Sequence, residues 1–242
     1  MEFLQVKGIT KSFGGLKAIQ NISCALREGE TLGMIGPNGA GKTTFFNLIS
    51  GFLHPNNGEI RFRGQGIHGK RPDEICHLGI TRTFQLIQNF PKMTALENVM
   101  VGAFTHTDDV AHARSKSLEM LEAVHLGGRA HLPVKSLTYA EKKSVELARA
   151  LATRPKLILV DEYMAGLTPT EIQEAIGLFR RIRERQKVTL FLVEHIMQAI
   201  MTLSDRVIVL HHGEKLAEGT PQEIVRNKEV IESYLGEEVL LA

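Results

Sequence analysis

The sequence predicts an α/β fold: a mostly parallel sheet core with an antiparallel β portion at the N-terminus and an inserted α-helical lobe. Three observations predict it. Short apolar runs typical of buried strands alternate with helical patterns, which is the arrangement of a parallel sheet. Two segments near the N-terminus alternate apolar and polar residues instead, as half-buried strands do. A long helical stretch interrupts the series, and its length predicts a separate lobe.

These patterns fit one domain over residues 1–242. Residues 1–92 and 154–242 are expected to form the core with its antiparallel portion, and residues 93–153 the helical lobe. The expected strands lie at residues 4–9, 19–26, 30–35, 59–63, 157–160, 188–193 and 206–210, with a hairpin around Gly213. The expected helices lie at residues 43–50, 96–126 with a polar interruption at 105–109, 141–153 and 170–185, followed by a further helix and a helical tail.

Composition narrows the class of protein. The chain has 29 basic and 27 acidic residues and a formal charge of +2, so we expect no nucleic-acid partner. Cys24 and Cys76 have no metal-type spacing and are expected to be reduced thiols. The first residues lack a basic region followed by an apolar run, and no run approaches the ~20 apolar residues of a spanning helix. We therefore expect any work at a membrane to go through a partner.

A glycine-rich loop follows the expected strand at 30–35 and precedes the expected helix at 43–50. This context is the one that a phosphate-binding P-loop requires, and an ordinary glycine-rich turn with a surface lysine fits it less well. Glycines let the backbone wrap closely around phosphates, Lys42 would reach the β- and γ-phosphates, and the Thr43 hydroxyl would bind Mg²⁺. The expected phosphate-binding residues are Gly36, Pro37, Asn38, Gly39, Ala40, Gly41, Lys42, Thr43 and Thr44.

An acidic pair completes the predicted ATP site. Asp161 ends the apolar strand at 157–160, where its carboxylate suits contact with Mg²⁺, directly or through water. Glu162 follows immediately and would point elsewhere, towards an attacking water. Alone, the pair would fit two exposed acids at a strand end equally well, but beside a P-loop we favour the catalytic interpretation.

The order of the motifs resembles the ATP-binding cassette (ABC) family over nearly the whole chain. The gap between Lys42 and Asp161 has the length that the helical lobe of that family fills. The resemblance implies a P-loop NTPase core with the ABC arrangement of domains. The motifs that carry it are Phe13, residues 36–44, Gln85, residues 137–143, Asp161-Glu162 and His195.

The resemblance implies roles for three more residues. Phe13 would stack on adenine, although an aromatic near a strand end is also common in ordinary cores. Gln85 matches the glutamine that touches Mg²⁺ and water and connects to the transport partner. His195 matches the histidine that contacts the γ-phosphate, whereas a lone histidine is more often structural.

Within the family, the chain is most similar to the ATPase subunits of branched-chain amino-acid importers. This similarity rests on Arg82-Thr83-Phe84-Gln85, residues 94–102, residues 165–169 and the ending Tyr234-Leu235-Gly236. Lipopolysaccharide-export ATPases resemble the same ending, so they remain an alternative.

The family's signature motif, usually Leu-Ser-Gly-Gly-Gln, departs from its pattern here. Thr138 keeps a hydroxyl, and Tyr139 resembles a variation seen in the branched-chain importers. Ala140 adds a Cβ where a phosphate should approach the backbone, and Glu141 adds a negative charge that Lys142 and Lys143 are expected to offset.

A structural interpretation fits the same residues. Thr138 and Glu141 have the spacing of a capping box that opens the helix at 141–153, which would turn Glu141 away from the phosphate. We favour an interpretation that combines the two: the signature is weakened, but it lies at a helix N-terminus that still attracts anions. Tyr163 replaces the proline that usually follows the catalytic glutamate, which puts the rigidity of that turn in question.

The resemblance implies an ATPase that powers import of branched-chain amino acids or a similar small solute. Its substrate and cofactor would be ATP and Mg²⁺. It implies a head-to-tail dimer with an identical or paralogous ATPase subunit, in which each signature closes the other's site. Membrane-spanning permease subunits would receive the region at 85–98, and a solute-binding protein would act indirectly. The chain would then lie in the cytoplasm, peripheral on the inner face of the cell membrane.

Two further alternatives stay open. A non-transport ABC ATPase usually carries long coiled coils or a second cassette, and this chain shows neither. An ATP-binding subunit with little turnover would follow if Ala140 and Glu141 disable the signature.

Overall fold

The computed structural model describes residues 3–235, so Gly236 of the predicted family-like ending lies outside the described residues. The chain divides into two compact units. Unit 1 comprises residues 3–75 and 189–235, and unit 2 comprises residues 76–188. Both units combine strands with helices, and the predicted α/β class is confirmed.

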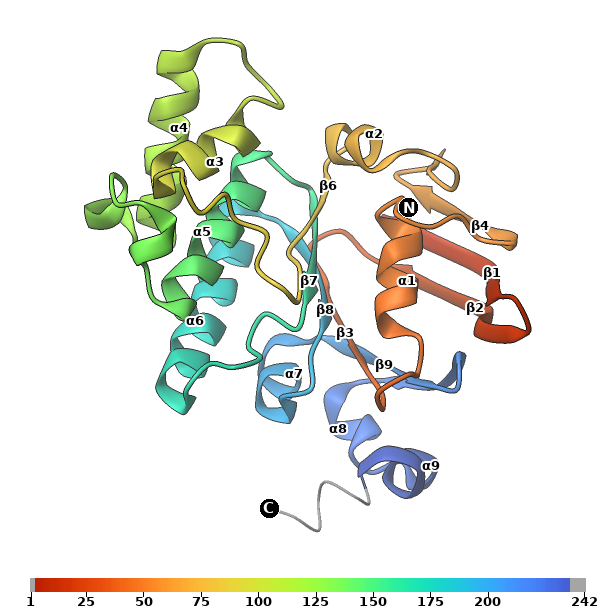
Figure 1. Cartoon of the computed structure of the whole chain (residues 1–242). Helices are drawn as coiled ribbons and strands as arrows, with labels where there is room; N and C mark the ends of the chain where they lie inside the picture. The colour runs from red at the N-terminus through yellow and green to blue at the C-terminus, as the bar shows by residue number, and fades with distance from the viewer. Residues whose placement is uncertain (1–2, 236–242) are drawn as a thin grey trace. The chain divides into compact units, whose positions relative to one another are not determined.

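Unit 1 contains the predicted antiparallel portion. Its strands are β1 (Leu4–Phe13), β2 (Leu16–Leu26), β4 (Asn57–Phe62) and the two-residue β5 (Gln65–Gly66), in the order β2-β1-β4-β5 (Figure 1). Val6 lies opposite Cys24 on one side and Ile60 on the other. All three side chains are buried, as the alternation of apolar residues predicts.

The parallel part of unit 1 is built on β3 (Thr31–Ile35). This strand pairs in parallel with β8 (Thr189–Val193) and with β9 (Arg206–His211), and β10 (Glu214–Gly219) turns back antiparallel on β9. Every residue of β3 and β8 is buried, which is why these strands are continuous apolar runs.

Helix α1 (Lys42–Ile49) follows β3 and packs its apolar side into the core of unit 1. The ring of Phe191 on β8 meets Phe45 and Phe46 edge-on, at centroid distances of 6.0 and 5.1 Å. The other helices of this unit are α7 (Met197–Leu203), α8 (Pro221–Ile224) and α9 (Lys228–Val230), with a π-helical turn at Ile231–Leu235; α2 (Pro72–His77) contains the boundary between the units.

Unit 2 holds two parallel strands, β6 (Ile80–Arg82) and β7 (Leu157–Asp161). Helices α3 (Ala95–Ala103), α4 (Val110–Ala123) and α5 (Tyr139–Ala152) pack against one another (Figure 1). The long α6 (Pro169–Gln186) follows β7, and single 3₁₀ turns lie at Gly127–Arg129 and Val134–Ser136.

The helical stretch expected at 96–126 is two helices, α3 and α4. They separate at the polar tract because Asp109 caps α4, accepting hydrogen bonds from the amides of Ala111 and His112. Unit 2 is larger than the predicted lobe, since it also contains β6, β7 and α6. The boundaries 93–153 of the lobe stay a prediction.

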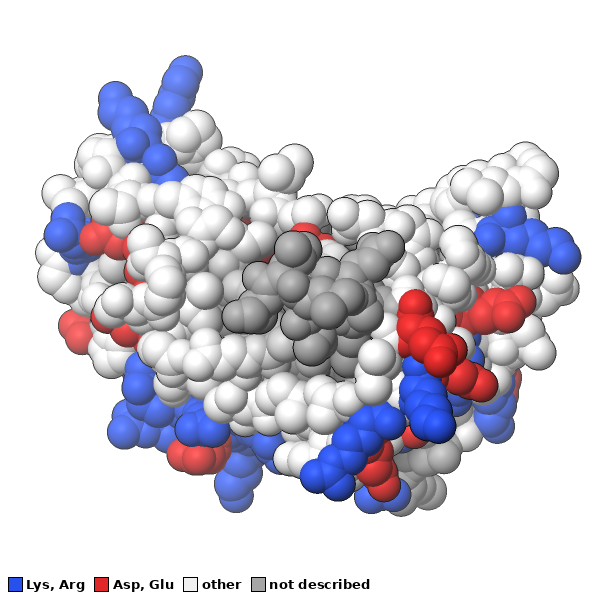
Figure 2. Space-filling view, turned by 90° about the horizontal axis from the view of Figure 1, so that it is seen from below, with Lys and Arg blue, Asp and Glu red and all other residues white. Residues whose placement is uncertain are grey.

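Charges of both signs lie together on the surface shown in Figure 2. Around its lower part, Lys and Arg side chains alternate with Asp and Glu side chains. Their fields partly cancel there, which matches the small formal charge of +2.

We predict that Phe191→Ala lowers the free energy of unfolding by about 3–5 kcal/mol, because it empties a fully buried ring site between two other rings. Denaturant unfolding of the purified chain measures the change. Phe52→Ala is the matched control, since Phe52 is 52% exposed and should cost far less. Equal losses for both variants would contradict the prediction.

Candidate functional site

The loop between β3 and α1 fits closely against its surroundings at two glycines. A Cβ at Gly36 would come within 2.1 Å of the Leu210 carbonyl oxygen, and one at Gly41 within 2.5 Å of the Ala18 carbonyl oxygen. Both glycines also have positive φ, 151° and 106°. Only glycine can therefore hold this loop in its observed path.

The start of α1 presents backbone donors. Gly41 is the N-cap residue and no side chain caps the helix. The buried Lys42 turns back, and its Nζ donates to the carbonyl oxygens of Gly36 (2.6 Å) and Pro37 (3.0 Å). Thr43 is exposed and Thr44 half-buried in the first turn. Backbone amides and an ammonium group thus gather at one helix N-terminus, which is the chemistry of a phosphate site.

Two other predicted site residues also lie in unit 1. Phe13 ends β1, and its ring is 47% exposed with Lys11 Nζ 5.3 Å from its centroid. An exposed aromatic face of this kind is able to stack on a flat ring. His195 lies two residues after β8 and is half-buried.

In unit 2, Asp161 ends β7 as predicted and is almost fully buried. Its Oδ2 atom lies 2.5 Å from Nη2 of Arg82, at the end of the neighbouring β6. Arg82 is also buried, and its guanidinium carbon lies 5.2 Å from the centroid of the Phe84 ring. The ion pair compensates two charges removed from water and fixes the direction of the Asp161 carboxylate.

The structure brings two predicted catalytic residues together. The side-chain amide of Gln85 donates to Oε2 of Glu162 at 2.6 Å. Glu162 directly follows β7 with a φ of 46°, an unusual value for a residue with a side chain. This backbone turn directs Glu162 away from the line of the strand.

The capping box predicted for the signature stretch is confirmed. Thr138 caps α5: its hydroxyl accepts from the Glu141 amide at 3.3 Å, and the Glu141 carboxylate accepts from the Thr138 amide at 2.8 Å. The other carboxylate oxygen of Glu141 lies 2.7 Å from Nε of Arg129. Glu141 is therefore held at the helix start, with Tyr139 exposed and Ala140 half-buried beside it.

The sequence predicted that Lys143 would offset the negative charge of Glu141, and this prediction is wrong. This lysine is 1% exposed and lies instead against the backbone of Glu162, with Nζ 3.4 Å from its carbonyl oxygen. Arg129, 12 positions before Glu141 and without a sequence signal, supplies the compensating charge.

Tyr163 keeps its turn in place by packing. Its buried ring meets Phe179 of α6 edge-on at 5.1 Å, and its hydroxyl hydrogen-bonds with Ser144. Burial raises the pKa of Tyr163, so the phenol stays neutral. The rigidity that a proline would give comes here from contacts with α5 and α6.

Sequence reasoning assigned no role to Arg82 or Glu146 and misplaced Lys143. Glu146 is 2% exposed and accepts a hydrogen bond from the Phe84 amide at 2.9 Å. Eight residues of α5 are buried, Glu146 among them, so burial on this helix is not confined to apolar positions and no local pattern identifies Glu146.

Comparison with known proteins agrees with this geometry. A family model described as ABC transporter matches residues 19–165, and one described as branched-chain amino acid ATP-binding cassette transporter matches residues 214–239. The chain is 39% identical to the high-affinity branched-chain amino acid transport ATP-binding protein BraF of Pseudomonas aeruginosa, over 97% of this chain and 98% of BraF.

Two solved structures are similar over almost the same length. MJ1267, an ATP-binding cassette of an ABC transporter, has a TM-score of 0.88 in its ADP conformation at 30% identity, covering 98% of this chain and 99% of MJ1267. MJ0796, a cassette solved as a dimer bound to ADP and Pi, has a TM-score of 0.81 at 27% identity, covering 90% of this chain and 98% of MJ0796.

The chain belongs to the ABC transporter ATPases. The predicted family, and with it the prediction of an ATP-binding and ATP-hydrolysing transport subunit, is confirmed. Within residues 3–235, no helix has the length and apolar character needed to cross a membrane.

Burial raises the pKa of Glu146 from 4.5 to about 7, although the Phe84 amide, Arg149 and Lys143 all favour the charged form. Between pH 4.5 and about 7 the folded protein therefore binds a proton at Glu146 that the unfolded chain does not. By linkage, this group lowers the free energy of unfolding as pH rises through that window.

We predict that Glu146→Gln removes the fall in the free energy of unfolding that Glu146 causes as pH rises. The variant should therefore become more stable relative to wild type between pH 5 and pH 8. The gain is at most about 3 kcal/mol, and denaturant unfolding at both pH values measures it. Glu97→Gln is the matched control. The amide and hydroxyl of Thr94 lower the pKa of Glu97 from 4.5, so its contribution to stability is constant between pH 5 and pH 8, and the pH curve of this variant should run parallel to that of wild type. Parallel pH curves for Glu146→Gln and wild type would refute the prediction.

Proposed function

We propose that this ABC ATPase powers inward transport of branched-chain amino acids or a similar small solute. The similarity to BraF over almost the full length and the family match at residues 214–239 support this substrate class. The observation that carries the ATP chemistry is the glycine-built loop, with its uncapped helix start and buried Lys42.

In this proposal, Lys42 and the amides of residues 36–44 hold the phosphates. Lys42 already lies against the carbonyls of its own loop, so a small change in its side chain would redirect the ammonium. Phe13 packs on the adenine with its exposed face, and His195 contacts the γ-phosphate.

Mg²⁺ would be held by oxygen ligands from Thr43, Asp161 and Gln85. A hydroxyl, a carboxylate and an amide oxygen are the ligand types that this hard cation prefers, and the residues present fit it. The ion would offset phosphate charge and orient the γ-phosphate. Arg82 fixes the carboxylate of Asp161 in one direction, so Asp161 would be an oriented ligand for the ion.

Glu162 would orient or deprotonate the attacking water. The hydrogen bond from Gln85 holds its carboxylate in place, and the left-handed backbone turn directs it away from β7. In this role Glu162 acts as a general base, whose contribution to rate is typically large.

A second ATPase subunit, identical or paralogous, would complete the site head to tail. The dimeric arrangement of the similar cassette MJ0796 supports this proposal. Thr138 would donate its hydroxyl proton to the partner's γ-phosphate, while its oxygen accepts from the Glu141 amide. Tyr139, Ala140 and Glu141 complete this surface at the start of α5.

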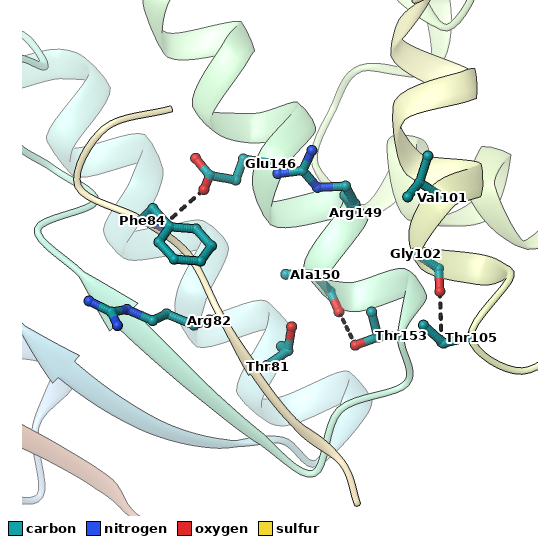
Figure 3. Close-up of a pocket in the computed structure, with 10 residues that line it drawn as sticks. All are labelled: Thr81, Arg82, Phe84, Val101, Gly102, Thr105, Glu146, Arg149, Ala150 and Thr153. Atoms are coloured by element: carbon teal, nitrogen blue, oxygen red, sulfur yellow. Dashed lines mark hydrogen bonds between the residues drawn. The ribbon is translucent and has the colours of Figure 1, made fainter. Parts of the chain in front are cut away.

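A membrane-spanning permease would dock on unit 2 beside Gln85. A pocket of about 240 Å³ lies there, between α3, α5 and the segment after β6 (Figure 3). Phe84 and the exposed Val101 give its wall apolar surface, and the buried Glu146 and half-buried Arg149 give it polar groups. A helix with apolar and polar faces would suit this surface. Further exposed apolar residues in the same stretch of sequence are Leu86, Phe90 and Phe104.

Docking of this kind would place the chain on the inner face of the cell membrane. A solute-binding protein would then contribute only through the permease and not by contact with this chain.

We predict that Glu162→Gln lowers ATP turnover by about 10²–10⁴-fold while ATP binding is retained, because it removes the base but not the phosphate ligands. Phosphate release and equilibrium binding of ATP, measured on the complex with its permease, check this. Glu184→Gln, an exposed change on α6, is the matched control. Phosphate release that does not depend on Glu162 would exclude the proposed catalytic role.

We predict that Val101→Glu reduces co-purification of the permease at least about tenfold, because it places a charge on the apolar wall of the pocket. Val110→Glu is the matched control, since Val110 is exposed on α4 and does not line this pocket. Thermal unfolding shows whether both variants remain folded. Equal recovery of the permease with both variants would argue against this docking surface.

A further inference from the structure

Helix α5 carries two buried ionisable residues to which the proposed ATP chemistry assigns no role. Lys143 and Glu146 lie three positions apart and are 1% and 2% exposed. Burying a charge is costly unless neighbouring groups compensate it. The groups that contact each of these side chains therefore indicate why it is buried.

Lys143 meets the backbone at Glu162. Its Nζ lies 3.4 Å from the Glu162 carbonyl oxygen, and 5.1 and 5.5 Å from the ring centroids of Tyr139 and Tyr163. Desolvated ammonium groups are attracted to aromatic faces, so the two rings stabilise the charge at this position. The carbonyl belongs to the residue with the left-handed φ of 46°, which needs support from its surroundings.

Glu146 meets the backbone next to Gln85. One carboxylate oxygen accepts from the Phe84 amide at 2.9 Å, and Figure 3 shows the carboxylate reaching across to this segment. Gln85 follows directly and donates to the carboxylate of Glu162. Helix α5 therefore supports Glu162 in two ways. Lys143 contacts its carbonyl oxygen directly. Glu146 acts indirectly, because it holds the Phe84 amide and the next residue, Gln85, donates to the Glu162 carboxylate.

The same helix begins at the signature stretch. Lys143 Nζ lies over the Tyr139 ring, and the ring lies close to the turn after Glu162, since a Cβ added at Gly166 would come within 3.2 Å of its Cε1 atom. Lys143 therefore lies between the residues proposed to face the partner's nucleotide and the residue proposed to activate water in this chain's own site.

We propose that Lys143 and Glu146 are positioning residues for ATP hydrolysis, which hold the backbone of Glu162 and of the Phe84-Gln85 segment from one helix. The proposal rests on the function assigned above to Glu162. It predicts loss of turnover without loss of nucleotide binding, since neither side chain is part of the phosphate loop.

The first test compares Lys143→Met with Lys143→Arg. The methionine keeps an apolar stem of similar length but loses the charge, and kcat should fall about tenfold or more with KM for ATP within about twofold, because misplacement of the base affects chemistry rather than binding. The arginine keeps the cation over the two rings and should recover much of kcat. Lys135→Met, which removes an exposed lysine outside the signature stretch, is the control for lost charge. Wild-type kcat in Lys143→Met, or equal loss of ATP binding and turnover, would overturn the proposal.

The second test separates length from charge at Glu146. Glu146→Gln keeps the acceptor at the same distance and should retain kcat within about threefold, whereas Glu146→Asp keeps the charge, withdraws the acceptor and should lower it. These changes are small, so they preserve the test if Lys143→Met fails to fold. The reverse order, with Asp active and Gln inactive, would overturn the proposed role of Glu146.

The third test identifies which site Lys143 serves. The test uses assembled complexes in which one of the two ATPase subunits has lost its catalytic glutamate. In one complex, Lys143→Met is placed on the subunit that keeps Glu162. In the other complex, it is placed on the subunit that has lost the glutamate. Turnover should fall only when Lys143→Met and the intact Glu162 share a chain. A fall only in the opposite arrangement would show that Lys143 acts through the signature on the partner's nucleotide.

Failure of the proposed function gives a different result. If wild-type phosphate release were unaffected by Glu162→Gln, the role of Glu162 itself would be wrong. If release depended on Glu162 but not on Lys143 or Glu146, only the positioning proposal would fail.

Discussion

Charged side chains buried in unit 2 constrain how its strands and helices meet. Arg82 and Asp161 neutralise each other at the ends of β6 and β7, while Lys143 and Glu146 reach from α5 to the backbone beside Glu162 and Gln85. An uncompensated charge in such a place would be strongly destabilising. Each contact therefore fixes a distance between elements, and these contacts hold Asp161 at the end of β7 and Glu162 directly after it.

Nearby contacts compensate for the residues that depart from the family's motifs. Glu141 turns back to cap its own helix and pairs with Arg129, so its charge is held at the start of α5. Tyr163 stands where the family usually has proline, and its buried ring is held by contacts with Phe179 and Ser144. Tyr139 and Tyr163 together flank Lys143, which makes the two tyrosines and the lysine one packing arrangement rather than three separate changes.

The loop between β3 and α1 in unit 1, which we propose binds phosphate, is held in a different way. Its backbone lies close to other backbone, at Gly36 against Leu210 and at Gly41 against Ala18, which leaves no room for a side chain at either glycine. Phe191 supports the helix that follows by packing on Phe45 and Phe46. Rigid packing behind the loop keeps its donors in one arrangement, which favours binding of an anion.

The sequence by itself determined the α/β class, the antiparallel N-terminal portion, the glycine-built loop before α1 and the Thr138–Glu141 capping box. These depend on local periodicity and on short fixed spacings, which a single chain displays directly. Only the tertiary structure decided what the buried charges of α5 and β6 contact. Lys143 and Arg129 show why: a charged residue has many possible partners far along the chain, and packing selects one. A local pattern contains no information about that choice.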